Sequence, residues 1–175
     1  MKRLVQRLTS NGDLQTPLGF REDIPSNLGS GYFDGAEARM VVTSELNDFA
    51  VGTGDFTIEW YQNIAVNTSY PRVFSIGSYN TGPQIAVSIE NNGSVFYFWV
   101  NGNRIITVGV GIPTDQWRHY AVVRYSGVTT LYQNGVSIAS SGTTYNLSTI
   151  VWELHIGNEY PPEEQYFNGY VTNFH

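Results

Sequence analysis

The strongest candidates for acid–base chemistry in this chain of 175 residues are two glutamates and a histidine near its end. Hydrolysis of a glycosidic bond with retention of configuration needs two carboxyl groups about 5 to 5.5 Å apart, one as nucleophile and one as acid and base. The sequence around Glu153 predicts a strand, on which Glu153 and His155 share one face and their apolar neighbours the other. A Gly-Asn pair should end this strand before Glu159. The spacing therefore predicts a surface Glu–His pair and argues against a hydrolytic pair of carboxylates.

Nucleophilic catalysis is not indicated by the three histidines. His119 and His155 fall in predicted strands, and His175 is the last residue. A serine that a histidine activates often stands in a Gly-x-Ser-x-Gly turn, and the chain contains neither this pattern nor another recognisable nucleophile context. We therefore expect a protein that is not an enzyme.

Stacking of flat rings on a ligand is the chemistry that residues 95–100 indicate. All six residues are apolar or aromatic, so a strand here carries rings on both faces. We expect Phe96 and Phe98 to point into the core, which leaves Tyr97 and Trp99, with their polar tips, on the outer face. Such rings suit a sugar, and they equally suit a protein interface or a position beneath a loop. The candidate ligand-binding residues are Tyr97 and Trp99, together with Tyr79 and Tyr160 in loops at the rim.

Strands must position these residues, because no stretch of a dozen residues carries a sustained helical apolar period. Five Asn-Gly pairs, among 18 glycines in all, punctuate the chain for tight hairpins. The clearest pattern runs from Gln116 to Arg124 as one strand, turns at Ser126-Gly127, and continues as a second strand to a turn at Asn134-Gly135. We expect Gly135 to adopt a left-handed conformation there, and Trp117 to be buried beneath the sheet.

The same hairpin resembles the signature of concanavalin A-like jelly-roll domains of the laminin G and pentraxin type. In that family a Trp-x-His strand ending in arginine precedes a strand that ends in aromatic-x-Asn-Gly, and the resemblance implies that His119 is a structural residue. Further segments match the family in order at residues 31–35, 54–60, 155–157 and 167–171. The resemblance implies an all-β fold: a two-sheet antiparallel jelly-roll sandwich over residues 30–175, preceded by an extended N-terminal arm, residues 1–29.

The resemblance also bears on catalysis and on metals. The glucanase branch of this superfamily places its carboxylates as Glu-x-Asp-x-x-Glu on one strand, and here His155 stands in place of the aspartate. Laminin G and pentraxin domains often bind calcium through loop carboxylates and carbonyls, which leave little local signature. The acidic loop residues of this chain do not align with those ligands: Asp34, Glu37, Asp48, Asp55, Asp115, Glu159, Glu163 and Glu164. We expect them to serve solubility and assign no cofactor, with calcium left as an open alternative.

Composition indicates one globular domain, because 41% of the residues are hydrophobic and only 14% are charged. Lys2, Arg3 and Arg7 account for three of the nine basic residues, so the remaining chain holds six basic residues against all fifteen acidic ones. A groove for DNA or RNA needs clustered Lys and Arg, and Lys2 is the only lysine. We therefore expect no nucleic-acid partner.

The N-terminal residues 1–29 form a compositional unit with little strand pattern. They are interpreted either as a solvated leader or as an arm that docks on a neighbouring subunit through Leu4, Val5 and Leu8. Polar residues from Gln6 onward interrupt what begins like a signal peptide, and no apolar run is long enough to span a membrane. We expect no classical signal peptide and no membrane insertion; the absence of cysteine leaves the redox compartment open.

The function that the resemblance implies is a non-catalytic carbohydrate-binding or adhesion module for a glycan or a glycosylated surface. Cysteine-free, lysine-poor domains of this kind often occur in structural proteins of phages and large viruses, so we expect a location on a virion surface or outside the cell. The alternative is a purely structural module that cements capsid or fibre subunits through its arm and a sheet face. A glycoside hydrolase is the least favoured interpretation, because the carboxylate pattern is missing.

Overall fold

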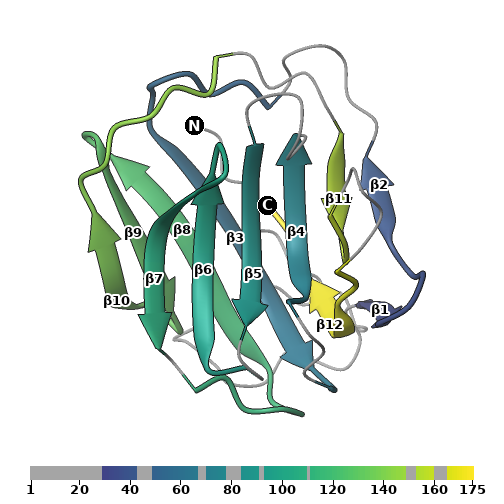
Figure 1. The fold of residues 1–175 in the computed structure, drawn as a ribbon. Coiled ribbons are helices and arrows are strands. Elements are labelled where there is room, and N and C mark those ends of the chain that lie inside the picture. The colour runs from purple at the N-terminus through teal and green to yellow at the C-terminus, as the bar shows by residue number, and fades with distance from the viewer. Residues whose placement is uncertain are drawn as a thin grey trace, which may run out of the picture.

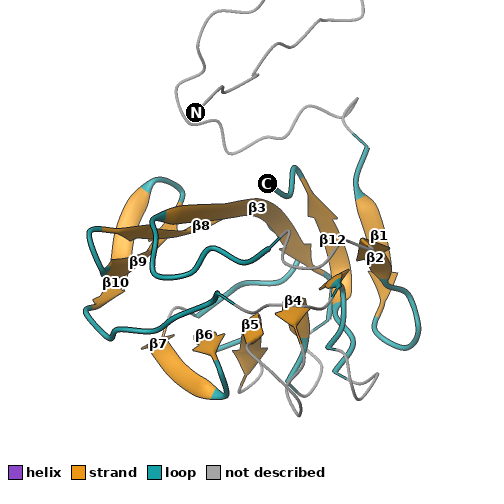
Figure 2. Ribbon diagram, turned by 90° about the horizontal axis from the view of Figure 1, so that it is seen from above, coloured by secondary structure: helices purple, strands orange, loops and turns teal. Residues whose placement is uncertain are grey.

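The computed structural model describes residues 29–42, 49–66, 70–77, 84–90, 93–109, 111–148, 153–159 and 165–175. Within these ranges the chain forms twelve strands and no helix. The strands build two six-stranded antiparallel sheets that face each other across a common core (Figure 1 and Figure 2). This arrangement confirms the predicted jelly-roll sandwich. The arm predicted for residues 1–29 lies outside the described residues except for Gly29, so its role stays a prediction.

The first sheet has the strand order β1-β12-β3-β8-β9-β10. Its strands are β1 (Gly31–Asp34), β12 (Asn168–Thr172), β3 (Phe56–Ile64), β8 (Arg118–Tyr125), β9 (Val128–Gln133) and β10 (Val136–Ser141). Alternate residues of β3 are buried, with Phe56, Trp60 and Ile64 among those that join the core. This period of two is what a strand with one core face and one outer face requires.

The second sheet has the strand order β2-β11-β4-β5-β6-β7. Its strands are β2 (Met40–Val42), β11 (Leu154–Ile156), β4 (Arg72–Gly77), β5 (Gln84–Glu90), β6 (Val95–Val100) and β7 (Asn103–Gly109). Every residue of β4 and β5 is buried, on the outer face as well as on the core face. Polar side chains on the outer face of these two strands are therefore shielded from water.

Trp60 stands at the centre of the core and is fully buried. Its ring lies 5.3 Å from that of Phe74 on the opposite sheet, 6.3 Å from Phe96 and 5.8 Å from Tyr120, measured between centroids. The indole nitrogen donates a hydrogen bond of 2.8 Å to the side-chain oxygen of Gln62. A buried indole N–H usually needs such a partner. The ring of Trp60 is therefore packed in the core, and its N–H group is hydrogen-bonded.

The prediction that Trp117 is buried beneath the sheet is wrong. Trp117 is half-buried and contacts Tyr170 on the outer side of the first sheet, at 6.2 Å between centroids. The reason is the strand period: Tyr120 and Val122 are the inward residues of β8, so Trp117 shares the outward side with His119.

The hairpin turns have the predicted conformation. Asn134 and Gly135 have φ values of 49° and 78°, as a two-residue turn of type I′ requires. The turn at Ser126-Gly127 shows the same pair of positive φ values, 49° and 80°. In addition, the Asn134 side chain accepts a 2.9 Å hydrogen bond from the backbone N–H of His119, which ties this turn to the start of β8.

Candidate functional site

The predicted aromatic pair lies on the outer face of the second sheet. Phe96 and Phe98 are fully buried in the core, as expected, and the rings of Tyr97 and Trp99 lie 5.8 Å apart on the opposite side of β6. Trp99 is half-buried, whereas Tyr97 is only 7% exposed. The ring pair therefore offers a ligand mainly the indole of Trp99.

Two arginines lie against these rings. The guanidinium carbon of Arg104, on β7, is 4.3 Å from the ring centroid of Tyr97 and 4.7 Å from that of Trp99. The guanidinium carbon of Arg72, at the start of β4, lies 5.2 Å from the Trp99 centroid. Contacts of this kind between a cation and an aromatic ring are attractive. The Arg104 side chain is 49% exposed, so it forms the accessible surface of the cluster.

Beneath the rings, a glutamate joins both arginines. Glu90, the last residue of β5, lies 3.6 Å from Arg72 Nη1 and 3.6 Å from Arg104 Nη2. The Ser88 hydroxyl donates a 3.0 Å hydrogen bond to Glu90 and accepts one of 2.8 Å from the indole nitrogen of Trp99. Trp99 is thus fixed in its orientation by the same group that holds Glu90.

A second glutamate holds the other side of Arg72. Glu159 accepts hydrogen bonds of 3.0 Å from Arg72 Nε and 2.7 Å from the side-chain amide of Gln84. Arg72, Gln84 and Glu159 are all buried. Among the described residues Arg72 Nη1 is buried without a hydrogen-bond partner, since its approach to Glu90 is too long for one.

The cluster of Arg72, Gln84, Ser88, Glu90, Trp99, Arg104 and Glu159, together with Tyr97, is called the outer-face site below. Burial of paired charges is weak evidence for stability, because desolvation offsets most of the Coulomb attraction. Such groups gather more often where a site needs fixed donors and acceptors. The outer-face site presents the exposed guanidinium donors of Arg104 beside the indole of Trp99, over buried carboxylates that hold the arginines, and this arrangement suits a ligand rich in hydroxyl groups.

Comparison with known proteins places the fold in a family. The family model described as the concanavalin A-like lectin/glucanases superfamily matches residues 32–175. The chain belongs to this superfamily. No curated protein matches the sequence at a significant level.

Solved structures with the same superfamily fold include domains LG4-5 of the mouse laminin α1 chain, with a TM-score of 0.65 and 17% identity. The alignment covers 84% of this chain and 40% of the laminin chain, so this chain spans less than half of its length. A pentraxin from Limulus polyphemus aligns with a TM-score of 0.62 and 16% identity, over 82% of this chain and 72% of the pentraxin. Domain 4 of an extracellular arabinanase from Geobacillus stearothermophilus, in complex with arabinotriose, aligns with a TM-score of 0.57, 17% identity and the same two coverages. These likenesses establish the lectin-like fold.

Of the other predicted site residues in this concanavalin A-like domain, Tyr79 and Tyr160 lie outside the described residues, and their place at the rim stays a prediction. Sequence reasoning missed Arg72, Glu90 and Arg104. A signal for part of the site was available in β5, where Gln84, Ser88 and Glu90 alternate with aliphatic residues. A strand of that pattern places its polar residues on one face, beside Tyr97 and Trp99 of the neighbouring strand.

Glu153 and His155 form the predicted pair, but only Glu153, with 39% of its side chain exposed, lies at the surface. His155 is 3% exposed; its Nε2 lies 3.4 Å from Glu153 and its Nδ1 lies 3.2 Å from the Asn158 side chain. The prediction was wrong for His155 because β11 lies within the sheet, between β2 and β4, where both of its faces are covered. Glu159, expected as a solubilising loop residue, is also buried and belongs to the outer-face site.

Two of the acidic loop residues, Asp34 and Asp55, accept hydrogen bonds from nearby backbone. One Asp34 oxygen accepts backbone hydrogen bonds from Ala36, Glu37 and Ala38, of 2.9, 3.0 and 2.9 Å, and these bonds lower the pKa of Asp34 to about 2. Asp55 accepts a 2.9 Å hydrogen bond from the backbone of Ser126. Within the described ranges no group of three or more histidines and acidic residues is arranged to hold a metal ion. Asp48, Glu163 and Glu164 lie outside those ranges.

A second aromatic cluster, which sequence reasoning missed, lies on the outer face of the first sheet. Tyr32 and Tyr170 are exposed cross-strand partners with ring centroids 5.0 Å apart, and Trp117 continues the row. Beside the row, His119 lies 3.4 Å from Glu59. Burial lowers the pKa of His119, and the charge of Glu59 offsets part of this effect. The structural role that the resemblance implies for His119 stays a prediction.

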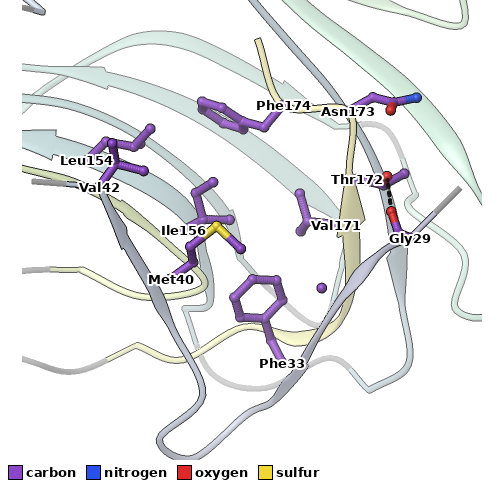
Figure 3. Close-up of a pocket in the computed structure, with 11 residues that line it drawn as sticks. Gly29, Phe33, Met40, Val42, Leu154, Ile156, Val171, Thr172, Asn173 and Phe174 are labelled. Atoms are coloured by element: carbon purple, nitrogen blue, oxygen red, sulfur yellow. Dashed lines mark hydrogen bonds between the residues drawn. The ribbon is translucent and has the colours of Figure 1, made fainter.

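A cavity opens between the sheets where β1 and β12 face β2 and β11 (Figure 3). Its volume is about 420 Å³. The lining is apolar apart from Thr172 and Asn173. Its residues are Gly29, Gly31, Phe33, Met40, Val42, Leu154, Ile156, Val171, Thr172, Asn173 and Phe174. The lining shares no residue with the outer-face site, so the two are separate places on the molecule.

Proposed function

We propose that this chain is a non-catalytic carbohydrate-binding module and that the outer-face site holds the glycan. The observation that carries the proposal is the indole of Trp99 set between two guanidinium groups, above carboxylates that are themselves held in place. An aromatic ring offers contact area to the apolar face of a sugar, while fixed polar groups at its edge set orientation and specificity. The bound arabinotriose in one protein of the same fold supports this choice of ligand class.

The geometry suggests how a sugar would enter. Arg104 lies over the rings, and its ion pair with Glu90 is long at 3.6 Å. Exchange of this contact for a hydrogen bond to a ligand hydroxyl would not leave buried Glu90 unpaired, because Glu90 still faces Arg72 and accepts a hydrogen bond from Ser88. Arg104 would then donate to the sugar while Trp99 contacts its ring. Buried Arg72 and Glu159 would keep the floor of the site rigid.

A binding role fits the carboxylates better than hydrolysis does. Glu159 already accepts two hydrogen bonds, and Glu90 accepts one from Ser88 and faces both arginines. A retaining hydrolase needs one carboxylate to attack the sugar and one carboxyl group to protonate the leaving group. In the proposed module both carboxylates serve instead to position their neighbours.

The proposed place of action is an exposed surface, either outside a cell or on a virus or phage particle, where the module would hold a glycan or a glycosylated surface. Two observations support a surface role: the lectin-like fold, and the extracellular enzyme among the proteins that share it. In the described part of the chain there is no helix long and apolar enough to cross a membrane.

A glycan array probed with the full chain tests the proposal, with Trp99→Ala as the site variant and Tyr32→Ala as the matched control. Tyr32 is an exposed aromatic residue on the other sheet. We expect the array to identify at least one glycan whose binding falls at least tenfold in Trp99→Ala and is unchanged in Tyr32→Ala. Thermal unfolding checks that both variants are folded. Equal binding by Trp99→Ala and the parent, or no binding to any glycan, would sink the proposal.

The structural-module alternative has its own supporting observation, the exposed row of Tyr32, Tyr170 and Trp117. A protein partner seated on this row would be lost in Tyr32→Ala and kept in Trp99→Ala, the reverse of the pattern expected for a glycan. Pull-down with the two variants separates these functions.

A further inference from the structure

The cavity between the sheets marks the open edge of the sandwich. At the other edge β7 and β10 approach each other and close the core. At the open edge the cavity is lined by buried Phe33, Ile156 and Val171, and also by Met40 and Val42 of β2 (Figure 3). Met40 is 50% exposed and Val42 is 40% exposed.

Two features of this edge call for an apolar cover. The exposed side chains of β2 adjoin the cavity, so together they make one apolar surface. In addition, β2 is the outermost strand of its sheet, and the backbone of an exposed apolar edge strand pairs readily with other chains unless something covers it. A segment that fills the cavity would cover the apolar side chains that line it.

The chain itself brings a suitable segment to the cavity. Gly29 lines the wall, and its carbonyl accepts a 2.8 Å hydrogen bond from the Thr172 hydroxyl. The residues just before it are Ile24-Pro25-Ser26-Asn27-Leu28, which carry no charge and present an aliphatic side chain at each end. Five residues span up to about 17 Å, enough to return from Gly29 across the cavity.

We infer that residues 24–28 dock in this cavity of the same molecule, with the side chains of Ile24 and Leu28 against Met40, Val42 and the buried residues of its lining. The inference concerns a surface separate from the outer-face site and does not rest on the proposed function. Attachment at Gly29 gives the segment an effective concentration on the order of millimolar, so modest contacts suffice to hold it. Pro25 has few conformations to lose and lowers the entropic cost of docking.

Charge and composition favour residues 24–28 as the occupant over the segment that follows β2. None of the residues that line the cavity is charged. Residues 43–48, which follow β2, carry Glu45 and Asp48, and burial of either carboxylate in an apolar cavity without a partner would be costly.

Methyl NMR on the full chain provides a direct test, because the protein has only two methionines, Met1 and Met40. We expect the double variant Ile24→Ser/Leu28→Ser to move the Met40 methyl resonance by more than its linewidth. The matched control, Leu4→Ser/Leu8→Ser, removes two leucines from the same N-terminal region and should leave the Met40 resonance in place. A Met40 resonance that is insensitive to Ile24→Ser/Leu28→Ser would overturn the inference.

Cysteine cross-linking gives an independent measurement, since the chain has no cysteine of its own. Under mild oxidation Ile24→Cys/Val42→Cys should form a disulfide within one molecule. The control Ile24→Cys/Val136→Cys, which uses an exposed residue on β10, should not. Disulfide-linked dimers in place of the internal bond would mean that the segment docks on a second copy, and no disulfide would mean that it does not dock; either result contradicts the inference.

Discussion

Trp60 and Trp117 show how strongly the role of a residue depends on its side of a strand. Both belong to segments that resemble the family pattern, and both are tryptophans next to other rings. Trp60 faces inward and contacts rings of both sheets, whereas Trp117 faces outward and contacts Tyr170. The stability of the core should therefore depend on Trp60.

We predict that Trp60→Ala lowers the free energy of unfolding by about 3 to 5 kcal/mol, because it removes a fully buried ring and leaves a cavity. Trp117→Ala should cost only about 1 kcal/mol, the scale of one aromatic contact at a partly exposed position. Urea denaturation of both variants measures the difference. A larger loss for Trp117→Ala than for Trp60→Ala would contradict this account of the core.

His119 should make stability depend on pH. Burial lowers its pKa in the folded protein below the ordinary value of 6.5, so the unfolded chain takes up a proton at a higher pH than the folded one. The stabilising contribution of neutral His119 is complete above pH 6.5 and is lost as the pH falls from there toward the lowered pKa. We predict that the free energy of unfolding of His119→Gln changes less over this pH range than that of the parent. The comparison with the parent cancels the contributions of the other two histidines. An unchanged profile would show that His119 titrates alike in both states.

At the scale of elements, the hairpins follow from local turn chemistry. The turn at Asn134-Gly135 joins β9 to β10 and holds β8 through the Asn134 side chain. The strands themselves need close contacts that only glycine permits: a Cβ on Gly169 of β12 would lie 2.1 Å from the backbone oxygen of Asn63 on β3.

We predict that Gly135→Val destabilises the protein by more than 1 kcal/mol, because a β-branched residue is strained at a φ of 78°. Gly135→Asn is the matched control, since asparagine tolerates this conformation far better. The midpoint of thermal unfolding should be highest for the parent, lower for Gly135→Asn and lowest for Gly135→Val. Equal midpoints for the two variants would contradict the turn assignment.

The parts of the structure that the sequence predicted are those set by neighbouring residues. The inward Phe96 and Phe98, the outward Tyr97 and Trp99, and the hairpin turns all follow from a period of two and from turn residues. The outer-face site depends instead on residues far apart in the chain, since Arg72 and Glu159 are separated by 87 positions. Irregular registers between paired strands make the site harder still to predict from the sequence.

One such irregularity decides the place of Arg104. The register between β6 and β7 shifts after Phe98, so that Arg104 lies opposite Trp99. With the regular pairing of Phe98 and Ile106 continued, Ile105 would stand there instead. A β-bulge of this kind re-aims side chains, and no periodic pattern in the sequence reveals it. The sequence therefore offers a signal for the aromatic residues of the site and for the polar residues of β5, but none for Arg72, Arg104 and Glu159.

For the whole molecule, the contrast between a closed edge and an open edge predicts where the fold opens first. We expect backbone amides of β1 and β2 to exchange with deuterium much faster than those of β3, β5 and β8, which lie inside their sheets. Hydrogen exchange followed by mass spectrometry on the full chain measures this order. Slowest exchange at β2 would contradict the assignment of an open edge.

The two ends of the described domain bear on how it would be tethered. The backbone of His175 pairs with that of Glu59 through two hydrogen bonds of 2.9 Å, and Gly29 is held by Thr172 of β12. Both ends therefore leave from the first sheet, whereas the outer-face site lies on the far side of the second sheet (Figure 2). A support, a label or a further polypeptide joined at either end would leave the ring of Trp99 pointing away from the attachment, which is the orientation that display on a surface requires.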